Sequence, residues 1–278
     1  MHWLLRVFVT LVCTLGALGV LFYFFQRRFL YFPLREDPSQ ALVSARRMGL
    51  EPWLGPDGGL VGWRSRHPSN RPQGRLLVLH GNAGSAANRV YFRDVFQAPG
   101  LLVALDVYLL EYPGYGPRDG TPSESSLLNA ADAALDALTA ADASPVYLLG
   151  ESLGTAVVAR AAADRPKSVA GLLLVTPLVN VPAVARRHFP FLPGFLIRDS
   201  WRTDRALPHY GGPIAFLVAG RDSIVFPELG EALYAAYPGP KRLWRDERAD
   251  HNTLDFTPAA TTWAEMLAFL REAGERTH

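Results

Sequence analysis

The chain has almost no cysteine and little lysine, and its charges nearly cancel. Cys13 is the only cysteine among 278 residues, which excludes a disulfide framework and metal sites built on cysteine. The 28 basic and 26 acidic residues leave a net charge of +2 and are interspersed, so no basic patch indicates binding to nucleic acid. Only Lys167 and Lys241 are lysines, which we attribute to codon usage. The sequence also lacks internal repeats and low-complexity tracts.

One long hydrophobic run is present at the amino terminus. Residues 7–25 carry no charge, and as a helix they would be about 28 Å long, close to the thickness of the bilayer hydrocarbon. Aromatic residues lie at both edges, and Arg27 and Arg28 follow, which predicts a single-pass anchor over residues 1–28. A cleaved signal peptide is the alternative, disfavoured because the run continues past the small residues at 17–19. More arginines follow the run than precede it, which predicts a cytoplasmic body.

The rest of the chain predicts an α/β fold. Residues 29–58 contain several X-Pro pairs and are expected to be a connecting arm. Residues 59–278 are expected to form the catalytic domain, a mostly parallel central sheet flanked by helices. The insertion at 178–212 is long enough for a small cap but not for a second domain. Strands are expected at 60–64, 76–79, 107–110, 146–149, 172–175, 214–218 and 242–244, and helices at 85–96, 121–140, 155–163, 227–237 and 257–272, with Thr121 as the cap of the second helix and Glu124 bonding back to it.

The pentapeptide from Gly150 to Gly154 is the most informative motif. It lies between an apolar run and an alanine-rich segment, which predicts a strand, a sharp turn and a helix with Ser152 at the apex. The glycines remove side chains that would clash at such a turn. The alternative is an ordinary glycine-rich turn, because a bare motif match is weak.

A serine nucleophile needs a base, and the base needs a carboxylate to orient it. Asp222 and His251 each follow a predicted strand, in the chain order serine, acid, histidine that this kind of turn requires. The carboxyl ends of parallel strands meet at one edge of the sheet, where ligands bind. The rival histidines and acids are His67, His80, His188, His209, Asp199, Asp204, Asp246 and Asp250.

The same edge should supply donors for a developing oxyanion. We expect the backbone amides of Leu153, which follows the nucleophile, and of Asn82, in the glycine-containing loop after the strand at 76–79, with the amide of Ala83 as the next choice. Ala83, Tyr112 and Tyr115 are candidates for substrate binding, although packing support is the role we favour for the two tyrosines.

Together these motifs resemble the α/β-hydrolase superfamily. More narrowly, the chain is similar to a small membrane-anchored branch named for a yeast bud-emergence suppressor, related to membrane lipid hydrolases, protein depalmitoylases and serine aminopeptidases. The resemblance implies the triad Ser152, Asp222 and His251. Departures from the branch occur at Pro113, Pro117, Thr155 and Phe226, which place substrate preference in doubt but remove no catalytic group. The motifs lie at residues 80–84, 112–116, 121–124, 150–154, 222–227 and 251–252.

The sequence therefore predicts a membrane-anchored serine hydrolase of acyl esters or thioesters, similar to esterases and lipases. The expected partners are the membrane and a small-molecule or lipid-like acyl substrate. No metal, cofactor or nucleic acid is expected. A serine peptidase acting on short peptides is one alternative, since Glu111 and Glu151 lie near the site and acidic residues recognise a peptide amine. A catalytically inactive, membrane-tethered interaction module is the other.

Overall fold

Apolar runs of five or six residues form the strands at the centre of the molecule. The computed structural model describes residues 2–69, 72–99, 101 and 103–276. Every residue of β4 (Gly74–Leu79), β8 (Gly171–Val175) and β9 (Ile214–Ala219) is buried, as expected for strands covered on both faces. The other strands are β1 (Phe32–Pro33), β2 (Glu51–Leu54), β3 (Leu60–Ser65), β5 (Ala83–Gly84), β6 (Leu105–Leu110), β7 (Val146–Glu151) and β10 (Lys241–Asp246).

The main sheet has eight strands in the order β10-β9-β8-β7-β4-β6-β3-β2. The six strands from β10 to β6 run parallel, and only β3 and β2 run antiparallel to their neighbours. The mostly parallel sheet expected from the sequence is therefore confirmed. Because β4, β7, β8 and β9 are adjacent, the loops that follow their carboxyl ends gather at one edge.

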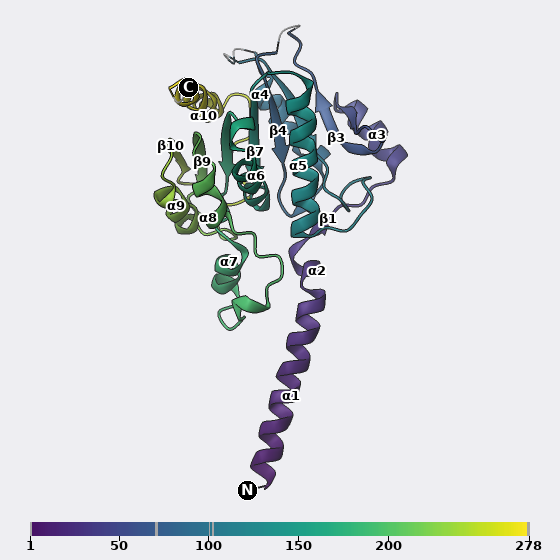
Figure 1. Ribbon diagram of the computed structural model, residues 1–278, viewed down its shortest axis with the longest axis vertical. Coiled ribbons are helices and arrows are strands. Elements are labelled where there is room, and N and C mark those ends of the chain that lie inside the picture. Colours follow the sequence, from purple (N-terminus) through teal and green to yellow (C-terminus); the bar gives the residue numbers. More distant parts are fainter. Residues whose placement is uncertain (1, 70–71, 100, 102, 277–278) are drawn as a thin grey trace.

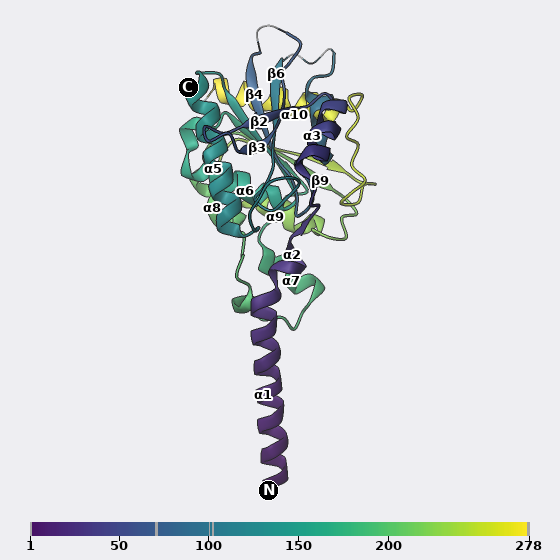
Figure 2. The same cartoon turned by 90° about the vertical axis from the view of Figure 1, so that its right-hand side faces the viewer.

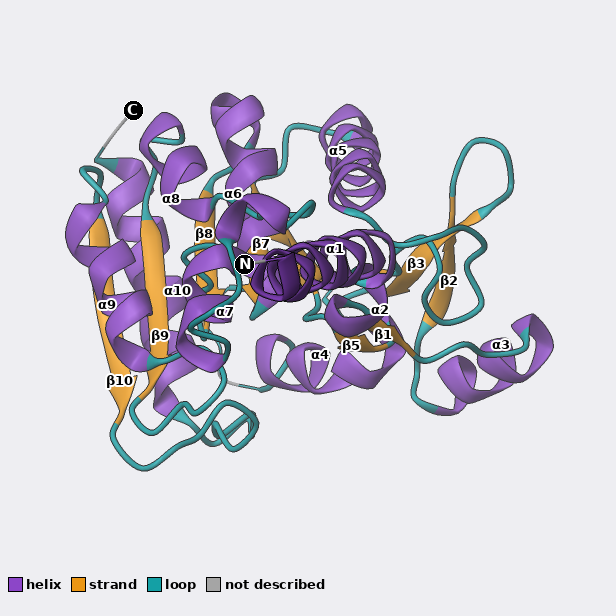
Figure 3. Ribbon diagram, turned by 90° about the horizontal axis from the view of Figure 1, so that it is seen from below, coloured by secondary structure: helices purple, strands orange, loops and turns teal. Residues whose placement is uncertain are grey.

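Helices cover both faces of the sheet (Figures 1 and 3), and each face has its own buried cluster. One cluster includes leucines and alanines of α5 and α6. The other includes Phe92, Phe96 and Trp263 of α4 and α10. The helices of the body are α3 (Pro38–Arg47), α4 (Val90–Phe96), α5 (Glu124–Ala141), α6 (Leu153–Asp164), α7 (Val181–His188), α8 (Thr203–Ala206), α9 (Pro227–Ala236) and α10 (Thr261–Glu275).

The amino-terminal run forms a single helix, α1 (His2–Phe25), that projects away from the body (Figures 1 and 2). It has no buried residue, and it is long and apolar enough to cross a membrane. The short helix α2 (Arg27–Leu30) follows it directly. Both views place α7 at the same end of the body as this junction, so the cap and the first helix share one side of the molecule.

The segment expected as a connecting arm takes part in the body. Residues 51–54 form β2, the edge strand of the main sheet, and Ala41 and Ala45 of α3 are buried in one of its two core clusters. Prolines at the first position of α3 and within an edge strand are compatible with regular structure, so the X-Pro pairs were a poor guide here.

Two further details differ from expectation. Helix α5 begins at Glu124 with Ser123 as its cap: the hydroxyl of Ser123 accepts from the amide of Ser126, whose own hydroxyl accepts from the amide of Ser123. A second serine three residues on thus completes a capping box that Thr121 and Glu124 were expected to form. In the insertion, Trp201 and Leu207 are buried in the main core, so only residues up to about 199 stand over the site as a cap.

Candidate active site

Ser152 lies at the apex of a sharp turn between β7 and α6. Its backbone has φ 52° and ψ −117°, a strained conformation for a residue with a side chain. Its amide donates to the carbonyl of Val175 at 2.9 Å, which fixes the turn against the neighbouring strand. A Cβ at Gly154 would overlap the carbonyl oxygen of Leu79, so the helix can approach β4 only with glycine at this position.

The structure brings Ser152, His251 and Asp222 together in a line. Ser152 Oγ lies 3.0 Å from His251 Nε2, and His251 Nδ1 lies 2.7 Å from Asp222 Oδ2. Asp222 is buried, and its Oδ1 accepts the amides of Ile224 and Val225 at 2.9 and 2.7 Å. The carboxylate therefore holds the proton of the imidazole on Nδ1 and leaves Nε2 to accept from the serine hydroxyl. Such an arrangement can take a proton from an attacking hydroxyl and return it to a leaving group.

The rival acid nearest the imidazole has a different role. Asp250 Oδ1 accepts the amides of His251 and Ser223 at 2.6 and 2.9 Å, so it ties two loops together and makes no bond to the ring. Four of the other rivals have partners away from Ser152: Asp199 pairs with Arg27, Asp204 pairs with Arg202, Asp246 accepts the amides of Arg248 and Ala249, and the amide of His67 donates to Asp106. His209 lies in the 3₁₀ turn at 207–209, and His188 lines the cavity described below, with its Nε2 2.9 Å from the carbonyl oxygen of Ile224.

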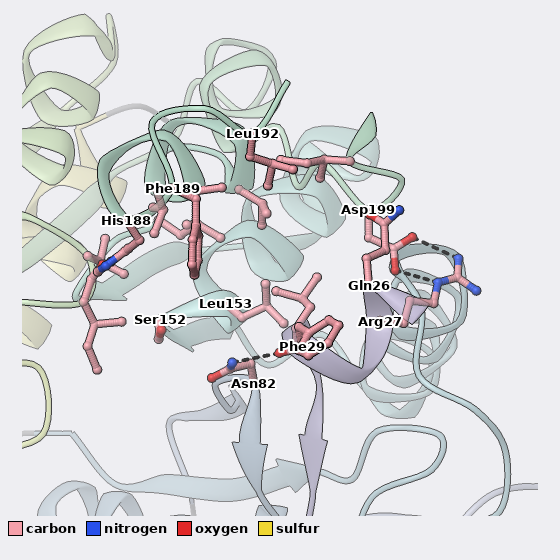
Figure 4. Close-up of a pocket in the computed structure, with 18 of the residues that line it drawn as sticks. Gln26, Arg27, Phe29, Asn82, Ser152, Leu153, His188, Phe189, Leu192 and Asp199 are labelled. Atoms are coloured by element: carbon pink, nitrogen blue, oxygen red, sulfur yellow. Dashed lines mark hydrogen bonds and ion pairs between the residues drawn. The ribbon is translucent and has the colours of Figure 1, made fainter. Parts of the chain in front are cut away.

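The two amides expected to stabilise an oxyanion belong to residues that line the same cavity as Ser152. Leu153 is the first residue of α6, where a backbone N–H has no acceptor within the helix. Asn82 follows β4, and its side-chain amide donates to the carbonyl of Leu30 at 2.8 Å (Figure 4). Its carbonyl accepts the amide of Phe32 at 2.8 Å. The loop is therefore held by groups of the amino-terminal segment, a contact that the sequence did not indicate.

Tyr112 and Tyr115 support this loop from beneath, which agrees with the packing role favoured for them and argues against them as substrate-binding residues. Both are fully buried, and their hydroxyls donate to the carbonyls of His80 and Asn82 at 3.0 and 2.8 Å. Their rings pack against the imidazole of His80. Ala83 is exposed in β5, which pairs with β1, and neither it nor the tyrosines line the cavity described below.

A buried carboxyl and imidazole lie behind the loop. Glu111 accepts the amide of Ala86 at 3.0 Å and the indole N–H of Trp63 at 3.3 Å. Its Oε1 is 3.8 Å from Nε2 of His80. Burial raises the pKa of Glu111 to about 7, and burial together with the charge of Arg89 lowers the pKa of His80 to about 3. His80 is therefore neutral at pH 7, and the pair is not an ion pair.

A cavity of about 770 Å³ lies over Ser152. Figure 4 shows its lining: Ser152, Leu153 and Asn82 on one side, α7 and the segment after it on another, and Gln26, Arg27 and Phe29 on the third. The full lining is Phe22, Gln26, Arg27, Phe29, Leu30, Asn82, Ser152, Leu153, Leu178, Val181, Val184, Ala185, His188, Phe189, Leu192, Ile197, Asp199, Ile224 and Val225. Among the described residues, no group of three or more histidines, cysteines and acids is placed to hold a metal ion.

Comparisons with known proteins agree with this architecture. A family model described as the alpha/beta hydrolase fold matches residues 74–207. The chain is 31% identical to the uncharacterized protein Rv2307c of Mycobacterium tuberculosis, over 95% of this chain and 94% of that protein. It is also 31% identical to the lysophosphatidylserine lipase ABHD12 of Macaca fascicularis, over 62% of this chain and 47% of the lipase. Protein bem46 of Schizosaccharomyces pombe is 26% identical, over 59% of this chain and 56% of that protein, which confirms the narrower resemblance.

Proposed function

The chain belongs to the α/β-hydrolase fold family, and from that premise we propose that it is a serine hydrolase that cleaves acyl ester or thioester bonds. Ser152 Oγ bonds to the acyl carbon while His251 takes its proton, and Asp222 orients the imidazole. The bond from the acyl carbon to the leaving oxygen or sulfur then breaks, and His251 returns the proton to the leaving group. Water repeats the sequence on the acyl-enzyme and releases the acid. The amides of Leu153 and Asn82 stabilise the oxyanion in both steps.

One observation carries this proposal: the continuous contact from Ser152 through His251 to Asp222, with separations of 3.0 and 2.7 Å. The strained backbone of Ser152 gives it independent support, because strain of this kind persists where the surrounding structure enforces it and is common at active sites. The mechanism as written uses no metal or organic cofactor.

The substrate we propose is lipid-like, and the protein is anchored by α1. The cavity beside Ser152 has a mostly apolar lining, and one relative is a lysophosphatidylserine lipase by name. The length and composition of α1 suit a membrane span. A cytoplasmic body remains the side favoured by the arginines that follow α1.

The peptidase alternative depended on Glu111 and Glu151 as groups that could bind a peptide amine, and neither is available for that role. Glu111 is fully buried behind the loop, and Glu151 is paired with Arg89 at 2.8 Å, so neither offers a free carboxylate to a peptide amine. The cavity lining contains one further carboxylate, Asp199, and that group is paired with Arg27. An ester or thioester substrate agrees better with these surroundings.

The test is labelling of the full-length protein with a fluorophosphonate probe. The wild type should be labelled and Ser152→Ala should not, while both proteins remain folded by circular dichroism. A folded wild type that takes no label would instead favour a catalytically inactive interaction module. Turnover of aryl esters compared with aminoacyl amides then separates an esterase from a peptidase, and faster turnover of the amides would refute the ester assignment.

A further inference from the structure

The first helix is attached to the cap by specific hydrogen bonds. Gln26, between α1 and α2, donates to the carbonyl of Leu196 at 2.9 Å and accepts the amide of Arg198 at 2.8 Å. The next residue, Arg27, makes two bonds of 2.9 Å to the two carboxylate oxygens of Asp199 (Figure 4). Residues about 170 positions apart in the chain are thereby joined at one point.

Asp199 is the centre of this attachment. It is buried, and it also accepts the hydroxyl of Tyr31 at 2.8 Å, which in turn accepts the indole N–H of Trp201 at 3.1 Å. The bond to Asp199 raises the pKa of Arg27, and burial and the charge of Asp199 raise the pKa of Tyr31. A buried carboxylate with three bonds fixes one geometry, because any other would leave a charge without a partner. The junction is therefore a rigid part of the body and not a loose tether.

This attachment joins the cap to the amino-terminal helices on the side of the cavity away from the sheet. Phe22, Phe29 and Leu30 from the amino-terminal helices and Val184, Leu192 and Ile197 from the cap line the cavity there. Phe22 is half-buried, whereas its neighbour Phe24 is 67% exposed. The polar groups on this side are occupied: Gln26 bonds to the cap, Arg27 pairs with Asp199, and the side chain of Asn82 bonds to Leu30.

Apart from His188, whose Nε2 lies 2.9 Å from the carbonyl oxygen of Ile224, the rest of the lining consists of apolar side chains that lead to the serine hydroxyl. The cavity volume of about 770 Å³ is within the range of roughly 300–1,000 Å³ that is typical of small-molecule sites. Phe22 belongs to the last turn of the helix that is apolar enough to span a membrane. On the cap beside it, Phe191 and Phe195 are 98% and 85% exposed, as suits side chains that meet the acyl region of a bilayer.

We propose that the end of α1 and the helix α2 form one wall of an acyl-chain site, so that Phe22 and Leu30 contact a long acyl chain and set the preference for it over a short one. This inference depends on the serine hydrolase function proposed above. The ligand is a single long fatty-acyl chain, which enters between the helix and the cap from the adjoining leaflet. The ion pair of Arg27 and Asp199 positions the wall and does not touch the reacting atoms.

The first test adds bulk to a residue of the proposed wall so that a long acyl chain no longer fits. Full-length protein in mixed micelles is assayed with p-nitrophenyl acetate, octanoate and palmitate, and Leu30→Trp is compared with Leu34→Trp, a leucine that does not line the cavity. Leu30→Trp should lower the ratio of kcat/KM for palmitate to that for acetate about ten-fold or more, since the added bulk meets only a long chain. Leu34→Trp should leave all three values unchanged.

The second test asks whether the first helix itself contributes. Phe22→Ala removes a lining ring, and Phe24→Ala removes an exposed one from the same turn. Only Phe22→Ala should lower the ratio of palmitate to acetate turnover, by about ten-fold, and should slow labelling by a hexadecyl but not an ethyl fluorophosphonate. If the two variants have identical chain-length profiles and Ser152 is still labelled, the proposed acyl-chain wall is refuted and the proposed hydrolase function is not. A folded wild type that takes no label at all would overturn both.

Discussion

The two halves of the cavity are built in opposite ways. On the sheet side, Ser152, Asp222 and His251 are 29 or more residues apart in sequence and are held by the turns that follow β7, β9 and β10. Asp222 is buried, and its Oδ1, the oxygen that does not bond to His251, accepts two backbone amides. On the side formed by the cap and the amino-terminal helices, the wall consists of apolar side chains from two segments about 170 residues apart, joined through Gln26, Arg27 and their partners.

Under the function and the acyl-chain site proposed above, this difference separates the residues that react from those that select the substrate. The order of the parallel strands fixes the catalytic side, so its geometry follows from the backbone. Side-chain bonds fix the selecting side, and the exposed residues of the cap tip contribute nothing to the core. Substitutions on the sheet side should therefore change the reaction rate or the folding of the protein. Substitutions on the side of the cap and the amino-terminal helices should change which acyl chains are accepted.

The largest expected effect distinguishes the two carboxylates beside His251. Asp222→Asn removes the charge that orients the ring and should lower kcat about 10⁴-fold, since a comparable change in a serine protease triad has that size. Asp250→Asn, a matched change in an acid that bonds only to Ser223 and the amide of His251, should cost less than about ten-fold. Steady-state turnover of a short aryl ester measures both. A greater loss in Asp250→Asn would reverse the assignment of the acid.

The catalytic side could be predicted from the sequence because each of its residues follows a recognisable apolar run. Gly150 to Gly154 marked the turn, and Asp222 and His251 were found by chain order at the ends of later strands. The sheet and most of its helices were predicted for the same reason: buried parallel strands are nearly continuous apolar runs. The catalytic roles themselves remain predictions, which the geometry supports.

The selecting side could not be predicted, because the signals for it are not local. The sequence placed Gln26 and Arg27 at the end of a predicted membrane span, and it placed Asp199 among the rival candidates for the catalytic acid. Nothing in either segment indicates that they meet. The same limit explains Tyr112 and Tyr115: their spacing placed them near the site, but only packing shows that they lie beneath the loop.

The second prediction concerns how tightly each side is built. Gly154→Ala would place a methyl group on the carbonyl oxygen of Leu79, a backbone atom that cannot move aside, and should destabilise the protein by about 4 kcal/mol or more or prevent folding. Gly194→Ala in the cap meets only Pro182, at 3.6 Å, and should change stability by less than about 0.5 kcal/mol. Urea denaturation of both variants tests this, and equal losses would remove the contrast between the two sides.

The third prediction follows from the buried Glu111. Its pKa is raised from an ordinary 4.5 to about 7, so the folded state holds the proton more tightly than the unfolded state. The stability that this contributes is complete below pH 4.5 and is lost as the pH rises through 7. Glu111→Gln keeps an acceptor for the amide of Ala86 but does not titrate. Between pH 4.5 and pH 8, the difference in unfolding free energy between the variant and the wild type should therefore shift in favour of the variant by up to about 3 kcal/mol.

The pKa shift of His80 changes stability with pH in the opposite direction, so its contribution has to be separated from that of Glu111. Its pKa is lowered from 6.5 to about 3, so its contribution is present above pH 6.5 and is lost as the pH falls. Both proteins keep His80, so the difference between their unfolding free energies at each pH isolates Glu111. A difference that does not change between pH 4.5 and 8 would mean that the carboxyl is already ionised in the folded state.

The smallest expected effect tests whether the cap tip has any part in the fold. Phe191 is 98% exposed, so Phe191→Ala should change the free energy of unfolding by less than about 0.5 kcal/mol. Phe92→Ala, the same substitution under α4 where the ring is fully buried against Phe256 and Trp263, should cost about 3–5 kcal/mol. Urea denaturation in a single detergent measures both. A loss above 2 kcal/mol for Phe191→Ala would place the cap tip in the core and erase the distinction between a side that folds the protein and a side that selects its substrate.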